Sequence, residues 1–165
     1  MNRVRTLLMS ALLVATFSTA YADNKIGVVD FQKLTQSSGK LDNIRNELEK
    51  KFKSRRDELV KMEEKLKKDF EAFKRDSAVM SDAKKKEAQQ KLIEAQQKFD
   101  KEGQAYQQDL SNAHNQAMQK LGKEVQQAVS KVAEADKFDL IVQKESVPYS
   151  NSKLDVTDKV LKALK

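Results

Sequence analysis

The chain of 165 residues carries 32 Lys and Arg against 25 Asp and Glu, and charged residues make up 35% of it. It has no Cys, one Pro and four Gly, and only 6% of its residues are aromatic. This composition is typical of long helices rather than of a compact globule. The lack of Cys excludes disulfides, thiol nucleophiles and thiolate metal sites, so we expect stabilisation by oligomerisation.

The first 22 residues have the pattern of a cleavable secretory signal. Arg3 and Arg5 precede an apolar run over residues 7–15, and small residues at Ala20 and Ala22 suit cleavage after Ala22. The apolar run is too short to span a bilayer. We therefore expect an exported protein that starts at residue 23, and an uncleaved anchor is the alternative.

The next segments predict a strand and then a long helix. Residues 25–31 are rich in β-branched side chains and bounded by charges, which is typical of a short strand. No Pro or Gly interrupts residues 41–80, and apolar residues recur there every three or four positions, which permits one helix of about 60 Å. Arg55 alone breaks this stripe, whose other members are Leu41, Ile44, Leu48, Phe52, Leu59, Met62, Leu66, Phe70 and Phe73.

Residues 76–82 predict the tip of a hairpin, with Ser81 or Asp82 as the cap of a second helix. Lys84, Lys85 and Lys86 follow, and three cations in a first turn oppose the helix dipole. The span from residue 50 to residue 102 holds 17 basic and 12 acidic residues. Such a surface speeds encounter with acidic partners, and the alternative is a frayed tip whose charges only keep the protein soluble.

In the second helix, residues of the apolar seam recur every eleven positions, a period that winds slightly to the right. The pattern predicts a narrow seam. The repeat has three series: Ala88, Phe99, Leu110, Leu121 and Val132; Ala95, Tyr106, Ala117 and Ala128; and, weaker, Leu92, Gly103, His114 and Val125. Many of these side chains are small, so they bury little area. We expect a slender arm that bends near residues 103–114, and the alternative is that Gly103 is an ordinary, tolerated glycine within the helix.

The C-terminal part predicts a strand at 138–143 and an edge strand at 147–149, where Pro148 is tolerable only at an edge. A closing amphipathic helix follows over residues 154–164, with Asp155 or Thr157 as its cap. Its inner face consists of Val156, Val160, Leu161 and Leu164.

Together these elements predict a mainly α fold with a small β body. Residues 23–40 and 133–165 form the body, and residues 41–132 form an antiparallel, coiled-coil-like hairpin arm. An isolated small sheet is marginal in water, so its apolar side chains need more cover than one chain supplies. We expect a homo-oligomer joined through the strands, by Ile26, Val28, Val29, Phe31, Leu140, Ile141 and Val142.

No enzyme constellation is visible in the sequence. His114 is a lone histidine, and metal sites need clusters. The four Gly are scattered and form no phosphate-binding loop. Acidic pairs such as Glu63 and Glu64 lie among Lys at helical spacing, as exposed ion pairs do. We expect no catalytic residue, no metal and no cofactor.

The order of the motifs resembles the Skp/OmpH-like family of periplasmic chaperones over essentially the whole chain. A signal peptide precedes KIGVVD at 25–30, and a Leu- and Phe-striped helix with LEKKFK at 48–53 follows. The return helix contains QKF at 97–99 and QAYQQD at 104–109. The chain closes with FDLIV at 138–142, VPYS at 147–150 and DVTDKVL at 155–161. Each motif is weak alone, and the order makes the resemblance specific.

The resemblance implies a trimer in which a small β body joins the subunits and three basic arms surround a cavity. It implies an ATP-independent holdase in the periplasm that carries unfolded outer-membrane β-barrel proteins in transit and prevents their aggregation. Contact with anionic lipid or lipopolysaccharide has also been suggested for the family, without residues that can be mapped onto this chain.

On the arm, we expect client contacts from the aromatic and tip residues Phe70, Phe73, Lys84, Lys85, Lys86, Phe99 and Tyr106. Only a part of this set is expected to be free, because some members must pack between the helices. Two alternatives remain, a structural coiled-coil spacer and a polyanion-binding protein of the envelope. Few aromatic residues are present for stacking on bases, and the export signal argues against nucleic acid as a partner.

Overall fold

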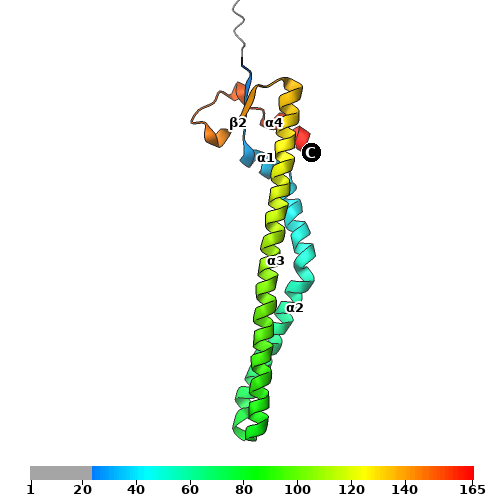
Figure 1. Cartoon of the computed structure of the whole chain (residues 1–165), viewed down its shortest axis with the longest axis vertical. Coiled ribbons are helices and arrows are strands. Elements are labelled where there is room, and N and C mark those ends of the chain that lie inside the picture. The colour runs from blue at the N-terminus through cyan, green and yellow to red at the C-terminus, as the bar shows by residue number, and fades with distance from the viewer. Residues whose placement is uncertain (1–23) are drawn as a thin grey trace, which may run out of the picture.

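The computed structural model describes residues 24–165, and the predicted signal at 1–22 lies outside the described residues. Within this part, a small body sits at one end of a long helical hairpin (Figure 1). The main elements are β1 (Ile26–Val29), α1 (Phe31–Ser37), α2 (Lys40–Asp76), α3 (Asp82–Asp136), β2 (Leu140–Gln143) and α4 (Thr157–Leu164). Short 3-10 turns lie at Ser77–Val79, Lys144–Ser146 and Ser152–Leu154.

The predicted hairpin arm is confirmed. Helix α2 has 37 residues and α3 has 55, which correspond to about 55 Å and 82 Å. The two helices run side by side in opposite directions, and α3 continues past the start of α2 into the body (Figure 1). At the tip, Ser81 is extended and α3 begins at Asp82, although no side chain caps this helix by a hydrogen bond.

The two predicted strands pair, and they do so in parallel. Ile26 lies opposite Leu140 and Val29 lies opposite Gln143, so the whole arm is the crossover between the two strands. The predicted edge strand at 147–149 is wrong. A 3-10 turn precedes this stretch, and the second neighbour of β1 is instead the segment at Asp155 and Val156, where the Val156 N–H donates to the Val28 carbonyl oxygen at 2.9 Å.

The first strand also ends earlier than its sequence suggests, because Phe31 is the first residue of α1 rather than the last of a strand. Asp30 causes the change, since its side chain accepts a hydrogen bond from the Lys33 N–H at 2.8 Å and caps the helix. Gly39 then adopts a left-handed conformation, with φ of 70°, between α1 and α2.

The core lies in the body, where α4 packs against α1 and the last turns of α3. The predicted inner face of the closing helix is confirmed, because Val156, Val160 and Leu164 are buried. The buried cluster consists of Val29, Leu34, Leu121, Val125, Ala128, Val132, Val156, Val160 and Leu164. The last turns of α3, at the base of the arm, are therefore packed into the core of the body.

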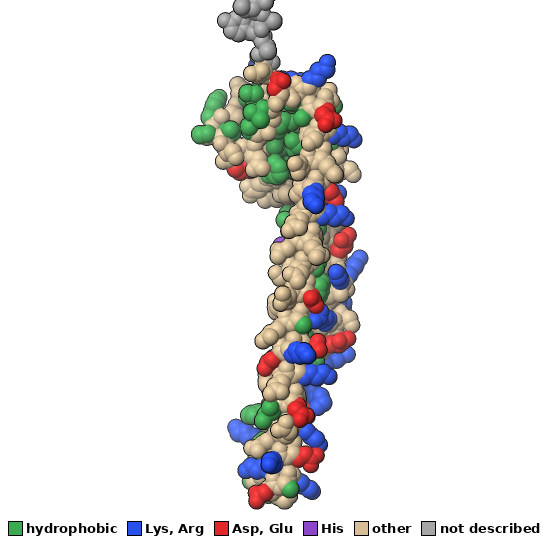
Figure 2. All heavy atoms as spheres, viewed as in Figure 1, with side chains coloured by type: hydrophobic (Ala, Val, Ile, Leu, Met, Phe, Trp, Pro, Cys, Tyr) green, Lys and Arg blue, Asp and Glu red, His purple; other side chains and the backbone are tan. Residues whose placement is uncertain are grey.

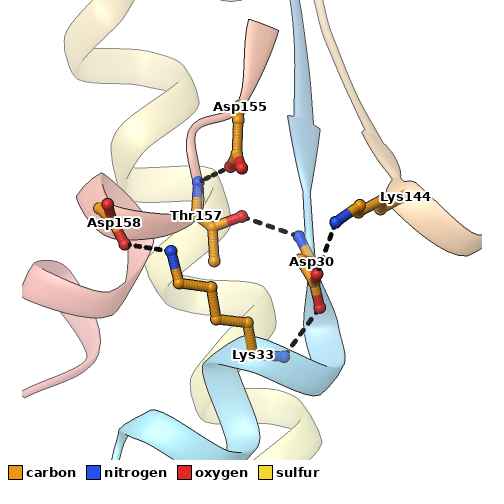
Figure 3. Close-up of polar contacts among 6 residues, drawn as sticks. All are labelled: Asp30, Lys33, Lys144, Asp155, Thr157 and Asp158. Carbon is orange, nitrogen blue, oxygen red and sulfur yellow. Dashed lines mark hydrogen bonds and ion pairs between the residues drawn. The ribbon is translucent and has the colours of Figure 1, made fainter. Parts of the chain in front are cut away.

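A polar network fixes the segments around this core (Figure 3). Thr157 is fully buried, and its Oγ1 accepts a hydrogen bond from the Asp30 N–H at 2.9 Å. Lys144 Nζ donates to Asp30 Oδ2 at 3.0 Å, and Lys33 Nζ donates to Asp158 Oδ1 at 2.8 Å. The hydrogen bonds from the Lys33 backbone and the Lys144 ammonium hold the pKa of Asp30 below its usual value. Sheet, α1 and α4 are thus joined by charge-assisted contacts.

Asp155 completes the network by accepting a hydrogen bond from the Thr157 N–H at 2.8 Å. Burial raises the pKa of this carboxyl group, but the hydrogen bonds from Thr157 oppose the effect and the net pKa is lowered. The predicted closing helix begins later than expected, at Thr157 rather than Leu154, and its N-cap position is Val156 rather than Asp155 or Thr157.

Fewer side chains are buried between the two helices of the arm than in the body. Phe52 is the one buried residue of α2, and the buried residues of α3 begin at Leu121. His114 is exposed, which corrects its expected place in the seam. The half-buried positions there are Leu110, Ala113 and Ala117, so His114 falls one residue beyond the contact line.

Candidate functional site

A groove lies between α2 and α3 near the tip of the arm. Its apolar lining is Leu66, Phe70 and Phe73 from α2 and Leu92, Ile93 and Phe99 from α3. Glu63, Lys67, Gln89, Gln96 and Gln97 form its polar rim, and its volume is about 1050 Å³. We call this feature the tip groove.

The tip groove follows from the residue pattern of the two helices. On α2, Leu66, Phe70 and Phe73 are spaced by three or four residues and so share one side of the helix. On α3, the apolar lining of the groove is formed by Leu92, Ile93 and Phe99. Large apolar side chains of both helices therefore face the groove, and those of Phe70 and Ile93 remain about half exposed.

Two of the lining side chains are unusually exposed. Phe70 retains 58% and Ile93 retains 51% of its accessible surface. Covering apolar surface is favourable by about 25 cal/mol per Å². An apolar segment that entered the tip groove would therefore gain binding free energy at these two side chains.

The tip lysines lie within about one turn of the tip groove. Lys84, Lys85 and Lys86 occupy the start of α3 and are exposed, and Gln89 of the rim follows Lys86 by about 4.5 Å of helix rise. Among residues 24–165, no ion pair involves these three lysines. The next acidic residue, Glu87, is engaged by Lys91 at 2.6 Å, and this hydrogen bond lowers the pKa of Glu87. The tip therefore presents uncompensated positive charge.

The structure brings together three of the four aromatic residues predicted for client contact, since Phe70, Phe73 and Phe99 all line the tip groove. Tyr106 lies elsewhere. Its ring meets Phe52 edge-to-face, with 5.9 Å between centroids and 84° between planes, so it packs within the arm. Tyr106 thus belongs to the set that joins the two helices.

Ile93 lines the tip groove but was not among the predicted residues. It falls directly after Leu92, outside the spacing of three or four residues that marks the seam. A large apolar residue off the seam of a charged helix is the signal that could have found it. The sequence alone leaves open whether such a residue meets a neighbour, and here Phe70 provides one across the groove.

Arg55, the polar interruption of the α2 stripe, reaches across the arm. Its Nη1 donates to Asp109 Oδ2 on α3 at 2.6 Å. Nearer the body, Lys40 Nζ donates to Glu124 Oε2 at 2.8 Å and lowers the pKa of Glu124. These half-exposed pairs fix the register of the helices more than they stabilise them.

The residues predicted for oligomerisation divide into two groups. Val28 and Val29 are buried within the protomer, whereas Ile26 and Leu140, which lie opposite each other in the sheet, are 40% and 51% exposed. Phe31 and Ile141 pack partly against the core, and Val142 is half-buried. Figure 2 shows hydrophobic side chains gathered on one face of the body. Direct contact with a second copy is therefore open chiefly to Ile26 and Leu140.

The part of the chain that the structure describes was also compared with the requirements of a metal site and of a membrane-spanning helix. Residues 24–165 contain no group of three or more acidic or His side chains placed to hold a metal ion. Across the same residues, no helix is both long enough and apolar enough to cross a bilayer.

The model of the family described as "Outer membrane protein (OmpH-like)" matches residues 25–164. The chain belongs to the OmpH-like family. The resemblance found in the sequence motifs is thereby confirmed, over both the body and the arm.

Curated OmpH-like relatives match along nearly their whole length. The protein named "Chaperone protein Skp" from Escherichia coli strain K12 is 31% identical over 161 residues, which are 96% of this chain and 98% of that protein. The protein of the same name from Blochmanniella pennsylvanica is 26% identical over 163 residues, or 98% of each chain. These relatives are named as chaperones, in agreement with the expectation that the chain is not an enzyme.

A solved OmpH-like structure supports the fold. The crystal structure described as a putative outer membrane chaperone (OmpH-like) from Caulobacter crescentus CB15 superposes with a TM-score of 0.76 at 18% identity. The match covers 86% of this chain and 83% of the other. Long paired helices rooted in a small body are therefore shared within the OmpH-like family at low sequence identity.

Proposed function

We propose that the protein is a periplasmic holdase chaperone that binds unfolded outer-membrane β-barrel proteins in transit and prevents their aggregation without ATP. The tip groove carries the proposal, because it keeps Phe70 and Ile93 about half exposed between two helices. The chaperone names of the relatives support the same class of function.

The tip groove suits the chemistry of such a client. A strand of an outer-membrane barrel alternates apolar and polar side chains. The α3 part of the groove runs from Gln89 to Phe99, about 15 Å, which corresponds to about four or five residues of extended chain. Two or three apolar side chains of one strand can enter the groove while the polar ones remain in water.

Holding a client without fuel requires contacts that are individually weak. A shallow groove that covers a few side chains meets this requirement, and several copies in one assembly would combine into avidity. Capture of the unfolded chain then lowers the free concentration that can aggregate. The exposed lysines at the tip would speed the encounter with acidic clients.

The assembly that we propose is a homo-oligomer, a trimer by the family resemblance, with the arms around a common space. The exposed pair Ile26 and Leu140 supports contact through the sheet. The small sheet adds to this support, since two strands of four residues are marginal by themselves.

Aggregation of an unfolded barrel protein tests the function. We expect protein purified from the periplasm to start at Asp23, to suppress light scattering on dilution of the client from urea, and to need no nucleotide. Phe70→Ala with Ile93→Ala should weaken client binding several-fold, because both exposed apolar contacts are lost. Val60→Ala with Val79→Ala is the matched control, since these exposed side chains lie outside the groove.

The two alternatives give different results in the same assay. A structural spacer would leave aggregation unchanged at every concentration. A polyanion-binding protein would bind vesicles of anionic lipid or lipopolysaccharide through Lys84, Lys85 and Lys86 while failing to capture the client. Either result would overturn the chaperone proposal.

A further inference from the structure

The middle of α3 is almost free of charge in a highly charged protein. Of the seventeen residues 103–119, only Asp109 is an Asp, Glu, Lys or Arg, and Arg55 pairs with it. By contrast, eleven of the seventeen residues 42–58 of α2 are Asp, Glu, Lys or Arg. The Phe52–Tyr106 and Arg55–Asp109 contacts place these two stretches side by side.

The uncharged stretch is rich in side chains with amide groups, and these share one face. Its exposed polar residues are Gln104, Gln107, Gln108, Ser111, Asn112, Asn115, Gln116 and Gln119. At 3.6 residues per turn, they fall within about half the circumference of the helix. The opposite half carries Tyr106, Leu110, Ala113 and Ala117, which are turned toward α2. We call the exposed half the amide face.

The amide face belongs to the less charged side of the arm. Figure 2 shows charged side chains crowded along the α2 side of the arm and mainly uncharged ones along the α3 side at mid-arm. A shallow hollow lies over Gly103, where a Cβ atom would meet nothing within 4 Å. Phe99, Gln104, Gln107 and Gln108 line this hollow, together with Ser111 and Asn112, and Asp100 is its one charged lining residue.

We propose that the amide face binds the backbone of the unfolded client in extended form. This inference rests on the proposed chaperone function and adds to it a second contact surface. Each Gln or Asn side chain offers both donors and an acceptor. An unpaired strand exposes the same groups along its backbone, N–H and C=O in alternation. The two surfaces are therefore complementary in hydrogen bonding whatever the client sequence.

Charge and position favour this occupant over others. The residues of the amide face carry no charge for an acidic or basic partner, and Asp100 at the end of the hollow is the one ion beside them. A neutral backbone bound to the face therefore requires little desolvation of ions. Phe99 lines both the hollow and the tip groove, so one extended segment can contact both. The face spans about 24 Å, or about seven residues of extended chain. The remaining possibility, a second copy of the arm, becomes an outcome of the test.

A triple substitution in the complete protein tests the inference. Gln104→Ala, Gln107→Ala and Gln108→Ala remove three amides at exposed helical positions, where Ala is the best helix former. Loss of three such hydrogen bonds should raise the dissociation constant for an unfolded barrel protein about tenfold or more. The matched control is Gln36→Ala, Gln126→Ala and Gln127→Ala, which removes three exposed amides at the body end of the molecule. We expect its affinity to stay within about twofold of the unsubstituted protein.

A modified client distinguishes backbone contacts from side-chain contacts. A synthetic peptide with the sequence of one barrel strand, methylated at alternate backbone nitrogens, keeps its side chains but lacks half of its N–H donors. We expect the unsubstituted protein and the control variant to bind it more weakly than the unmethylated peptide. The triple variant should discriminate less between the two peptides, since its amide acceptors are gone.

Each other result overturns the inference. Equal client affinity for the triple and control variants would remove the amide face from client binding while leaving the chaperone function intact. A changed oligomer mass in the triple variant alone would show that the face joins copies of this chain. Unchanged discrimination between the peptides would show that backbone groups are not contacted. Failure of the unsubstituted protein to bind any unfolded barrel protein would instead overturn the proposed function, and this inference with it.

Discussion

The body and the arm differ in how they are held together. In the body, a buried cluster joins Leu34, Val160 and the end of α3, and a polar network fixes the segments around it. In the arm beyond Leu121, Phe52 is the one buried side chain, and the helices otherwise share half-buried seams and a few ion pairs. The comparison teaches that the sequence places rigidity where copies of the chain are expected to meet. It places adaptable surface where a client is expected to bind.

Substitutions of apolar side chains in the body and in the arm should show the largest difference between the two regions. Leu34 is fully buried, so Leu34→Ala should cost about 2–5 kcal/mol in free energy of unfolding. Leu59→Ala in the half-buried seam of the arm should cost much less, because part of that side chain already contacts water. Urea denaturation at a fixed protein concentration measures both, and equal costs would contradict the division into a rigid body and a thin arm.

Assembly should depend on the body alone. Leu140→Asp places a charge on the exposed part of the sheet, where an unpaired charge in an interface is strongly unfavourable. We expect the oligomer to dissociate in sedimentation while the helical circular dichroism is retained. Val28→Asp is a poorer test, since Val28 is buried within the protomer and its substitution should unfold the body. An intact oligomer with Leu140→Asp, at the mass of a Lys131→Asp control on α3, would exclude assembly through the sheet.

The polar network should make the body sensitive to acid. The pKa of Asp30 is lowered in the folded protein, so its carboxylate stabilises the fold above the unfolded pKa of about 4, and this contribution is lost as the pH falls further. Asp30→Ala should cost about 0.5–2 kcal/mol at neutral pH through loss of the helix cap. Asp30→Asn should flatten the decline of stability below about pH 5. Denaturation curves between pH 3 and 7 measure this, with Asp100→Asn on the arm as the control variant.

The tip lysines should affect the rate of capture more than its strength. Replacing Lys84, Lys85 and Lys86 by Gln should slow association with an acidic unfolded client several-fold at low salt and leave dissociation nearly unchanged. The effect should shrink at physiological salt, where charges are screened over about 8 Å. The same change at Lys120, Lys123 and Lys131 removes equal charge near the body. Stopped-flow rates that respond equally to both triple substitutions would assign the effect to net charge rather than to the tip.

The smallest effect concerns bending of the arm near residues 103–114. Gly103→Ala should stabilise the helix by about 0.5–1 kcal/mol, because Ala lowers the entropy cost and its Cβ meets nothing within 4 Å. It should also narrow the distribution of distances between arm tips. Because the chain has no Cys, Ser77→Cys provides one spin label per tip. Gly122→Ala has the same free space but lies at the base of the arm, so an equal narrowing there would contradict a hinge near Gly103.

The sequence by itself determined the long elements and the family. Apolar spacing of three or four residues over 41–73 and the repeat of eleven over 88–132 define helices without any tertiary information, because one side of each must be apolar. Apolar spacing likewise indicated the closing helix, and β-branched residues indicated the two strands. The motif order along the chain was sufficient for the OmpH-like resemblance. Phe70, Phe73 and Phe99 could be named as candidates because they are large apolar residues on the predicted arm.

Only the tertiary structure decided how these elements meet. Parallel pairing of β1 and β2, and Val156 in place of an edge strand at 147–149, depend on contacts between segments more than a hundred residues apart. Burial of Val28 and exposure of Leu140 depend on which side of a two-stranded sheet the core covers. Ile93 lines the tip groove and Tyr106 lies outside it, because the relative position of the two helices is set by the packing between them. A periodic pattern gives the side of a helix that is covered, but not the neighbour that covers it or how completely.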